Sequence, residues 1–187
     1  MKKIVVFASG SGSNFETIVK KLHNKECEVA LLICDRPGAY CLERAKTLGI
    51  KTLQLTLKDF PTKVAYELEI MKHLQKINPA LIVLAGYMKL VGETLLDEYE
   101  GKIINIHPSL LPAFPGADGI KDAIQYGVKV MGVTVHYVDA GMDTGKIIDQ
   151  ESFRRGDDET AEASKEKIHA IEHELYPKVI KKLLNEA

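Results

Sequence analysis

The chain has 187 residues, 45% of them hydrophobic, and its 25 basic and 26 acidic residues leave a net charge of -1. This length fits one α/β domain over residues 1–187 and can bury a sizeable core. A balanced charge without blocks of one sign argues against a nucleic-acid-binding protein and favours small-molecule substrates as partners.

Strand-like and helix-like patterns alternate through the first hundred residues. Short apolar runs rich in β-branched residues, typical of buried parallel strands, occupy residues 4–8, 29–33 and 81–85. Amphipathic patterns typical of helices lie near residues 14–24, 40–48 and 64–77. The alternation predicts a Rossmann-like α/β fold, with an open, mostly parallel twisted sheet and helices on both faces.

A loop of small residues, GSGSN at 10–14, joins the first strand to the first helix. Its backbone N–H groups can converge on an anion at the positive end of the helix, which predicts a phosphate site. The dinucleotide pattern is broken because its third glycine would fall at Phe15. Asp35, after the second strand, still leaves a nicotinamide enzyme open as an alternative. A plain turn with Ser13 or Asn14 as N-cap is another.

The next predicted strand, residues 102–106, leads into the sequence NIHPSLLP at 105–112. Residues two apart in a strand share a face, so Asn105 and His107 should project together, and Pro108 should keep His107 extended. An amide can donate to a developing oxyanion, and a histidine can exchange a proton near neutral pH. We therefore interpret the pair as catalytic. The alternative is an Asn that closes a turn beside a His satisfied by backbone.

The last third should contain an irregular loop at 108–119, strands at 130–138 and 147–153, and an amphipathic helix from about Asp158. Asp143 lies in the Gly-rich turn 139–145, where a turn-forming and a functional role are equally compatible with the sequence. We interpret His136 as a packed or backbone-bonded strand residue. Glu172 and His173 fit an ordinary solvated helix face.

Two further features bear on metals and on the compartment. The aspartates of this region, at 139, 143 and 149, lack a His or Glu to complete a ligand set, so no metal is expected. Cys27, Cys34 and Cys41 form no C-x-x-C pair and suit a reducing cytosol. Neither a signal peptide nor a membrane-spanning run is apparent, so we expect a cytoplasmic protein with no membrane partner.

Taken together, five segments resemble the folate-dependent formyltransferase family. They span essentially the whole chain in order: residues 10–14, 85–90, 105–112, 134–138 and 142–145. The resemblance is closest to members that formylate glycinamide ribonucleotide. The 105–112 segment is shared with tRNA formyltransferases and formyltetrahydrofolate deformylases, so it indicates the chemistry more than the acceptor.

The resemblance implies direct transfer of a formyl group from the co-substrate 10-formyltetrahydrofolate to the ribonucleotide amine, through a tetrahedral intermediate. It implies a catalytic trio of Asn105, His107 and Asp143. The implied ribonucleotide contacts are Gly12, Ser13, Asn14 and Glu172. The implied folate contacts are Lys63, Met88, Lys89, Leu90, Val91 and Asn105.

Two departures from the family pattern are visible. Lys63 and Lys89 stand where relatives can carry Arg, and Lys keeps the charge but loses the bidentate fork. Some relatives have histidines after the Pro-Gly of the long loop, whereas here Pro115 and Gly116 lead into an Ala and an Asp. A role for those histidines does not carry over.

Three other functions stay open. A formyltetrahydrofolate deformylase would be expected to add an N-terminal regulatory module, and a tRNA formyltransferase a C-terminal nucleic-acid module with a basic balance. A nucleotide-binding module without catalysis is the third. A monomer and a homodimer are equally compatible with the sequence.

Overall fold

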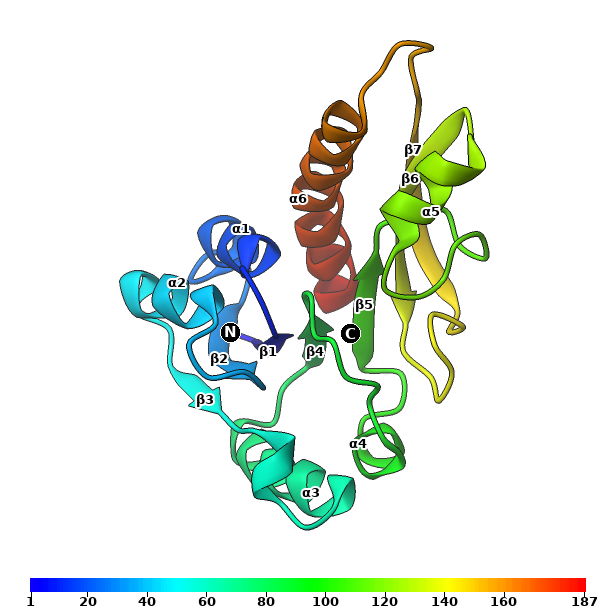
Figure 1. Ribbon diagram of the computed structural model, residues 1–187. Helices are drawn as coiled ribbons and strands as arrows, with labels where there is room; N and C mark the ends of the chain where they lie inside the picture. Colours follow the sequence, from blue (N-terminus) through cyan, green and yellow to red (C-terminus); the bar gives the residue numbers. More distant parts are fainter.

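In the computed structural model, residues 1–187 form one seven-stranded sheet with helices packed on both faces (Figure 1). The strands are β1 (Lys3–Ala8), β2 (Glu28–Cys34), β3 (Thr52–Gln54), β4 (Leu81–Leu84), β5 (Ile103–His107), β6 (Val130–Tyr137) and β7 (Ile147–Arg154). The helices are α1 (Ser13–Leu22), α2 (Tyr40–Leu48), the short 3-10 helix η1 (Leu57–Asp59), α3 (Lys63–Ile77), α4 (Glu93–Glu98), α5 (Gly119–Tyr126) and α6 (Ala161–Glu186). None of these helices combines the length and apolar composition needed to cross a membrane.

The strand order β3-β2-β1-β4-β5-β6-β7 places a reversal of the chain path between β1 and β4. The first five strands are all parallel to their neighbours among them. β6 is antiparallel to β5, and β7 is antiparallel to β6. The carboxyl ends of β1, β4 and β5 therefore meet at one edge of the sheet. Open α/β sheets bind ligands at this edge, near such a reversal. The first loop, after β1, and His107, at the end of β5, therefore open on the same edge.

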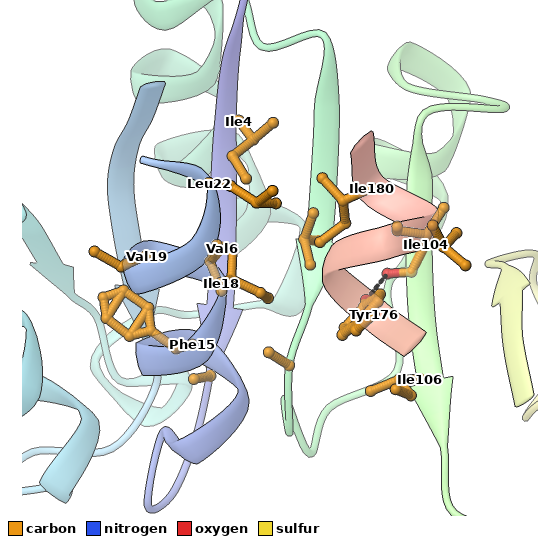
Figure 2. Close-up of a cluster of buried hydrophobic side chains, with 14 of the residues drawn as sticks. Ile4, Val6, Phe15, Ile18, Val19, Leu22, Ile104, Ile106, Tyr176 and Ile180 are labelled. Carbon is orange, nitrogen blue, oxygen red and sulfur yellow. Dashed lines mark hydrogen bonds between the residues drawn. The ribbon is translucent and has the colours of Figure 1, made fainter. Parts of the chain in front are cut away.

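Side chains alternate along the central strands, so each strand contributes to two cores. Ile4 and Val6 of β1 pack with α1 and α6 on one face (Figure 2). Val5 and Phe7 pack with α3 and α4 on the other. Apolar residues at every strand position are what a sheet covered on both faces requires.

Tyr176 fixes helix α6 against the middle of the sheet. Its side chain is fully buried, and its hydroxyl donates to the carbonyl oxygen of Leu84 at 2.7 Å. It also donates to the carbonyl oxygen of Ile104 at 3.3 Å (Figure 2). Burial raises the pKa of Tyr176 far above its ordinary value, so the hydroxyl keeps its hydrogen. Glu172, one helical turn earlier, is thereby held beside the carboxyl edge.

The predicted strands and helices are confirmed, with small shifts at their ends. β5 extends to His107, and α6 begins at Ala161 because the Thr160 hydroxyl caps it by accepting from the Ala163 N–H at 3.1 Å. The sequence interpretation missed four short elements: β3, η1, α4 and α5. Each has eight residues or fewer, too few to show a hydrophobic period clearly.

Candidate active site

A pocket opens at the carboxyl edge of the sheet, between the loops that follow β1, β4 and β5, the turn after β6, and helix α6. Nine of the residues expected in a functional site line it: Asn14, Met88, Lys89, Leu90, Val91, Asn105, His107, Asp143 and Glu172. Three expected residues do not line it. Gly12 and Ser13 lie just before Asn14, and Lys63 lines a neighbouring surface pocket that shares Lys89 with this one.

The end of β5 brings Asn105 and His107 to the pocket together. Ile104 and Ile106 point into the core beneath α6, so the alternate residues project from the opposite face, as their spacing predicts. Asn105 is half-buried, and His107 is 4% exposed. A site this shielded from water strengthens the hydrogen bonds and charges within it.

Both ring nitrogens of His107 have protein neighbours. Nε2 lies 2.8 Å from the carbonyl oxygen of Phe114, in the loop after β5. A carbonyl only accepts, so Nε2 carries a hydrogen and donates it. Nδ1 lies 3.5 Å from Oδ2 of Asp143, which makes the carboxylate a close electrostatic neighbour of the ring.

Asp143 ties three parts of the site together. Its Oδ2 accepts a hydrogen bond from the Gly116 N–H at 2.8 Å, which fixes the loop after β5 to the turn after β6. Its Oδ1 lies 3.7 Å from Nε2 of His136. The backbone of Asp143 is left-handed, with φ of 54°, a conformation that Asp tolerates better than most residues. This conformation places the Asp143 carboxylate beside both His107 and His136.

His136 is a site residue that the sequence interpretation missed. Its Nδ1 donates to the Tyr137 carbonyl at 2.8 Å, so the expected backbone bond is present. Its Nε2 faces the site, 3.4 Å from Nδ2 of Asn105, and its side chain lines the pocket. Antiparallel pairing of β5 with β6 sets His136 directly opposite Asn105. No hairpin joins these strands, because α5 lies between them, so their register cannot be read from residue spacing.

On the other side of the pocket, the first loop is shaped by Gly12. It caps α1 in a left-handed conformation, with φ of 74°, and a Cβ there would lie 2.6 Å from Cβ of Cys41. Only glycine satisfies both conditions. The alternative of a plain turn capped by Ser13 or Asn14 is wrong, because no side chain caps this helix. Oδ1 of Asn14 is buried without a hydrogen-bond partner, beside the pocket that Asn14 lines.

Glu172 also faces the pocket. It is 6% exposed, so the alternative of a solvated helix face is wrong for this residue. Oε1 of Glu172 lies 2.8 Å from Nδ1 of His169, and this contact raises the pKa of His169 above its ordinary value. The His169 ring therefore holds the carboxylate in position.

The 88–91 segment forms the opposite wall. Met88 and Leu90 leave 60% and 49% of their surfaces exposed, whereas Val91 is buried. Nζ of Lys89 pairs with the buried carboxylate of Asp35 at 3.0 Å. Asp35 thus neutralises a lysine and does not line the pocket, which removes the ribose-binding role considered for a nicotinamide enzyme. Nowhere in the chain do three or more His, Cys, Asp or Glu side chains gather as a metal ion would require.

Comparison with known proteins finds relatives over nearly the whole chain. Residues 2–180 match the family model described as "Formyl transferase". The chain is similar to the phosphoribosylglycinamide formyltransferase of Bacillus subtilis, at 52% identity over 98% of this chain and 95% of that protein.

Solved structures give the same result. Glycinamide ribonucleotide transformylase 1 from Geobacillus kaustophilus superposes with a TM-score of 0.94 at 53% identity, covering 98% of this chain and 99% of that one. Phosphoribosylglycinamide formyltransferase from Streptococcus pneumoniae superposes with a TM-score of 0.92 at 49% identity, over 98% and 99% of the two chains. The likeness covers the sheet, the helices and the carboxyl edge together.

Proposed function

This chain belongs to the formyl transferase family, and from that premise we propose that it transfers the formyl group of 10-formyltetrahydrofolate to the primary amine of glycinamide ribonucleotide. The products are formylglycinamide ribonucleotide and tetrahydrofolate, and the reaction is a step of purine synthesis. The observation that carries the proposal is the gathering of Asn105, His107 and Asp143 beside one pocket, in a chain with full-length relatives named for this activity.

The amine attacks the formyl carbon, and negative charge develops on the formyl oxygen. Asn105 and His107 are assigned to donate hydrogen bonds to that oxygen. The contact of the Asn105 Nδ2 with His136 is long, at 3.4 Å, so it is a weak hydrogen bond. The amide therefore loses little interaction energy when it donates to the substrate instead. The His107 Nε2–H is held by the Phe114 carbonyl, so the loop after β5 must release it.

Proton movement completes the transfer. A new bond joins the ribonucleotide nitrogen to the formyl carbon, and the bond from that carbon to the folate nitrogen breaks. The amine loses one proton, and the folate nitrogen gains one. Asp143, 3.5 Å from His107, is assigned to stabilise a charged imidazole and to pass the proton between the two nitrogens.

The ribonucleotide is assigned to the side of the pocket formed by α1 and α6. Gly12, Ser13 and Asn14 would hold the phosphate of the ribonucleotide at the positive end of α1. The backbone N–H groups in the first turn of α1 have no partner within the helix and can donate to the phosphate. Glu172 would accept from its hydroxyl groups. The unpartnered Oδ1 of Asn14 supports a polar ligand here, because a buried acceptor without a partner is costly.

The co-substrate is assigned to the opposite wall. Met88 and Leu90 expose apolar surface that a folate ring would cover, and Val91 with Asn105 completes that wall. Lys63 and Lys89 lie at its outer end, where they offer positive charge to the acidic tail of the folate. Asp35 partly neutralises the positive charge of Lys89, which weakens the electrostatic attraction of Lys89 for a ligand.

Small-molecule substrates are the partners that this function requires. We further propose a cytoplasmic enzyme, a monomer or a homodimer, whose residues 1–187 form one catalytic domain. The unbroken seven-stranded sheet supports the single domain.

The test follows conversion of 10-formyltetrahydrofolate to tetrahydrofolate with and without glycinamide ribonucleotide. Transfer requires the amine, so we expect conversion only when the ribonucleotide is present. Equal conversion in its absence would identify a deformylase. No conversion in either case would identify a binding module.

A further inference from the structure

Helix α3 holds the pocket-lining segment 88–91 at both ends. Before the segment, the hydroxyl of Tyr87 lies 2.9 Å from the hydroxyl of Tyr66 on α3, and both side chains are buried. After the segment, the Gly92 N–H donates to Oε2 of Glu67 on α3 at 2.8 Å. The two contacts bracket the four residues that form the proposed folate wall.

The contact at Glu67 is unusual because it buries a carboxylate away from any substrate. Glu67 is 2% exposed, and burial raises its pKa above the ordinary value. A Cβ at Gly92 would meet this carboxylate, so the backbone approaches Glu67 as closely as a glycine allows. Burying a carboxyl group is costly unless it is hydrogen-bonded, and here its partner is the backbone N–H at the end of the segment.

The contact at Tyr87 is part of a larger aromatic group. The Tyr87 ring packs edge-on against Phe7 of β1, with ring centroids 5.2 Å apart, and Tyr66 packs edge-on against Phe60 at 5.7 Å. Edge-to-face pairs fix ring orientation as well as distance. Tyr87 therefore fixes the backbone before Met88 relative to both the sheet and α3.

Between these anchors the segment has contacts of its own. Lys89 pairs with Asp35 at 3.0 Å, the Leu90 carbonyl accepts from Nζ of Lys63, and the Val91 side chain is buried. The Met88 and Leu90 side chains are exposed, and the Met88 N–H donates to the Ser9 hydroxyl at 2.9 Å. Misplacing a binding wall by about 1 Å is enough to weaken catalysis strongly. The anchors at each end add to these contacts in keeping the wall in place.

We propose that Tyr66 and Glu67 are positioning residues for the folate co-substrate, acting through Tyr87 and Gly92 on the 88–91 segment. The inference rests on the proposed function, because it assumes that this wall holds the folate. Neither residue lines the pocket itself.

The experiment uses the full chain and determines kcat and the two KM values, varying one substrate at a time. Glu67→Ala leaves the Gly92 N–H without its partner, and we expect KM for 10-formyltetrahydrofolate to rise about tenfold or more. KM for glycinamide ribonucleotide should stay within about twofold. Glu67→Gln keeps an acceptor oxygen and should recover most of the folate affinity. Tyr66→Phe should raise the folate KM by a few fold.

Leu74→Ala is the matched control. Leu74 is fully buried on the same helix, about 10 Å further along its axis, and its loss should lower the melting temperature without changing the ratio of the two KM values. The proposal is overturned if Glu67→Ala leaves the folate KM unchanged, raises both KM values equally, or matches Leu74→Ala in that ratio. Failure of the wild-type enzyme to transfer formyl would instead remove the proposed function.

Discussion

Nε2 of His107 lies 2.8 Å from the carbonyl oxygen of Phe114, so the hydrogen that we assign to the formyl oxygen is already donated to the loop after β5. Asp143 binds the same loop through the Gly116 N–H. The proposed catalytic residues are thus part of the interactions that hold this loop in place. In the proposed mechanism, substrate replaces the Phe114 carbonyl as the partner of His107 before charge develops on the formyl oxygen.

Replacing Asn105 by Ala removes one proposed donor to the formyl oxygen. We expect kcat to fall about 10²- to 10³-fold, because oxyanion donors act mainly in the transition state. KM for the ribonucleotide should change little. Steady-state kinetics checks this, with Gln125→Ala, outside the pocket, as a control that keeps normal turnover. Near-normal turnover of Asn105→Ala would refute the assignment.

Replacing Ser13 by Glu places a negative charge at the amino end of α1. The charge repels a phosphate bound there, so KM for glycinamide ribonucleotide should rise by about tenfold or more, while KM for the folate stays the same. Measuring each KM at saturation of the other substrate separates the two. An unchanged ribonucleotide KM would show that the phosphate binds elsewhere.

Replacing Tyr176 by Phe removes the two hydrogen bonds that fix α6 to β4 and β5. The free energy of unfolding should drop by about 1–3 kcal/mol, because buried carbonyls lose a partner. Urea denaturation measures the change. Tyr126→Phe serves as control, since Tyr126 is 81% exposed and its replacement should leave stability unchanged. Equal stability of both variants would mean that the buried bonds contribute nothing.

The His169–Glu172 pair should make stability depend on pH. Because Glu172 raises the pKa of His169, the charged imidazole stabilises the folded state fully below its ordinary pKa, and this contribution is lost as pH rises through the raised value. Wild-type protein should therefore exceed His169→Ala in melting temperature at acid pH, and the gap should close at alkaline pH. His169→Gln, which donates without titrating, is the control, and a gap that is constant with pH would contradict this coupling.

The parallel core of the fold could be read from the sequence because buried strands carry continuous β-branched runs, as at residues 4–8 and 81–85. The shared face of Asn105 and His107 followed from strand periodicity alone. The position of His136 did not, because it depends on which strand lies beside β5 and in which register. Residue spacing also cannot show that Lys89 pairs with a buried Asp35, since that contact joins different loops.

We propose that this site moves a formyl group to an amine with the help of His107. The most direct test supplies 10-formyltetrahydrofolate labelled with ¹³C in the formyl group, together with glycinamide ribonucleotide, and follows the label by NMR. With wild-type enzyme the label should appear in the formamide of the ribonucleotide product, and His107→Ala should slow its appearance by about 10²-fold or more. Label that accumulates as formate, or that reaches the ribonucleotide equally fast without His107, would contradict it.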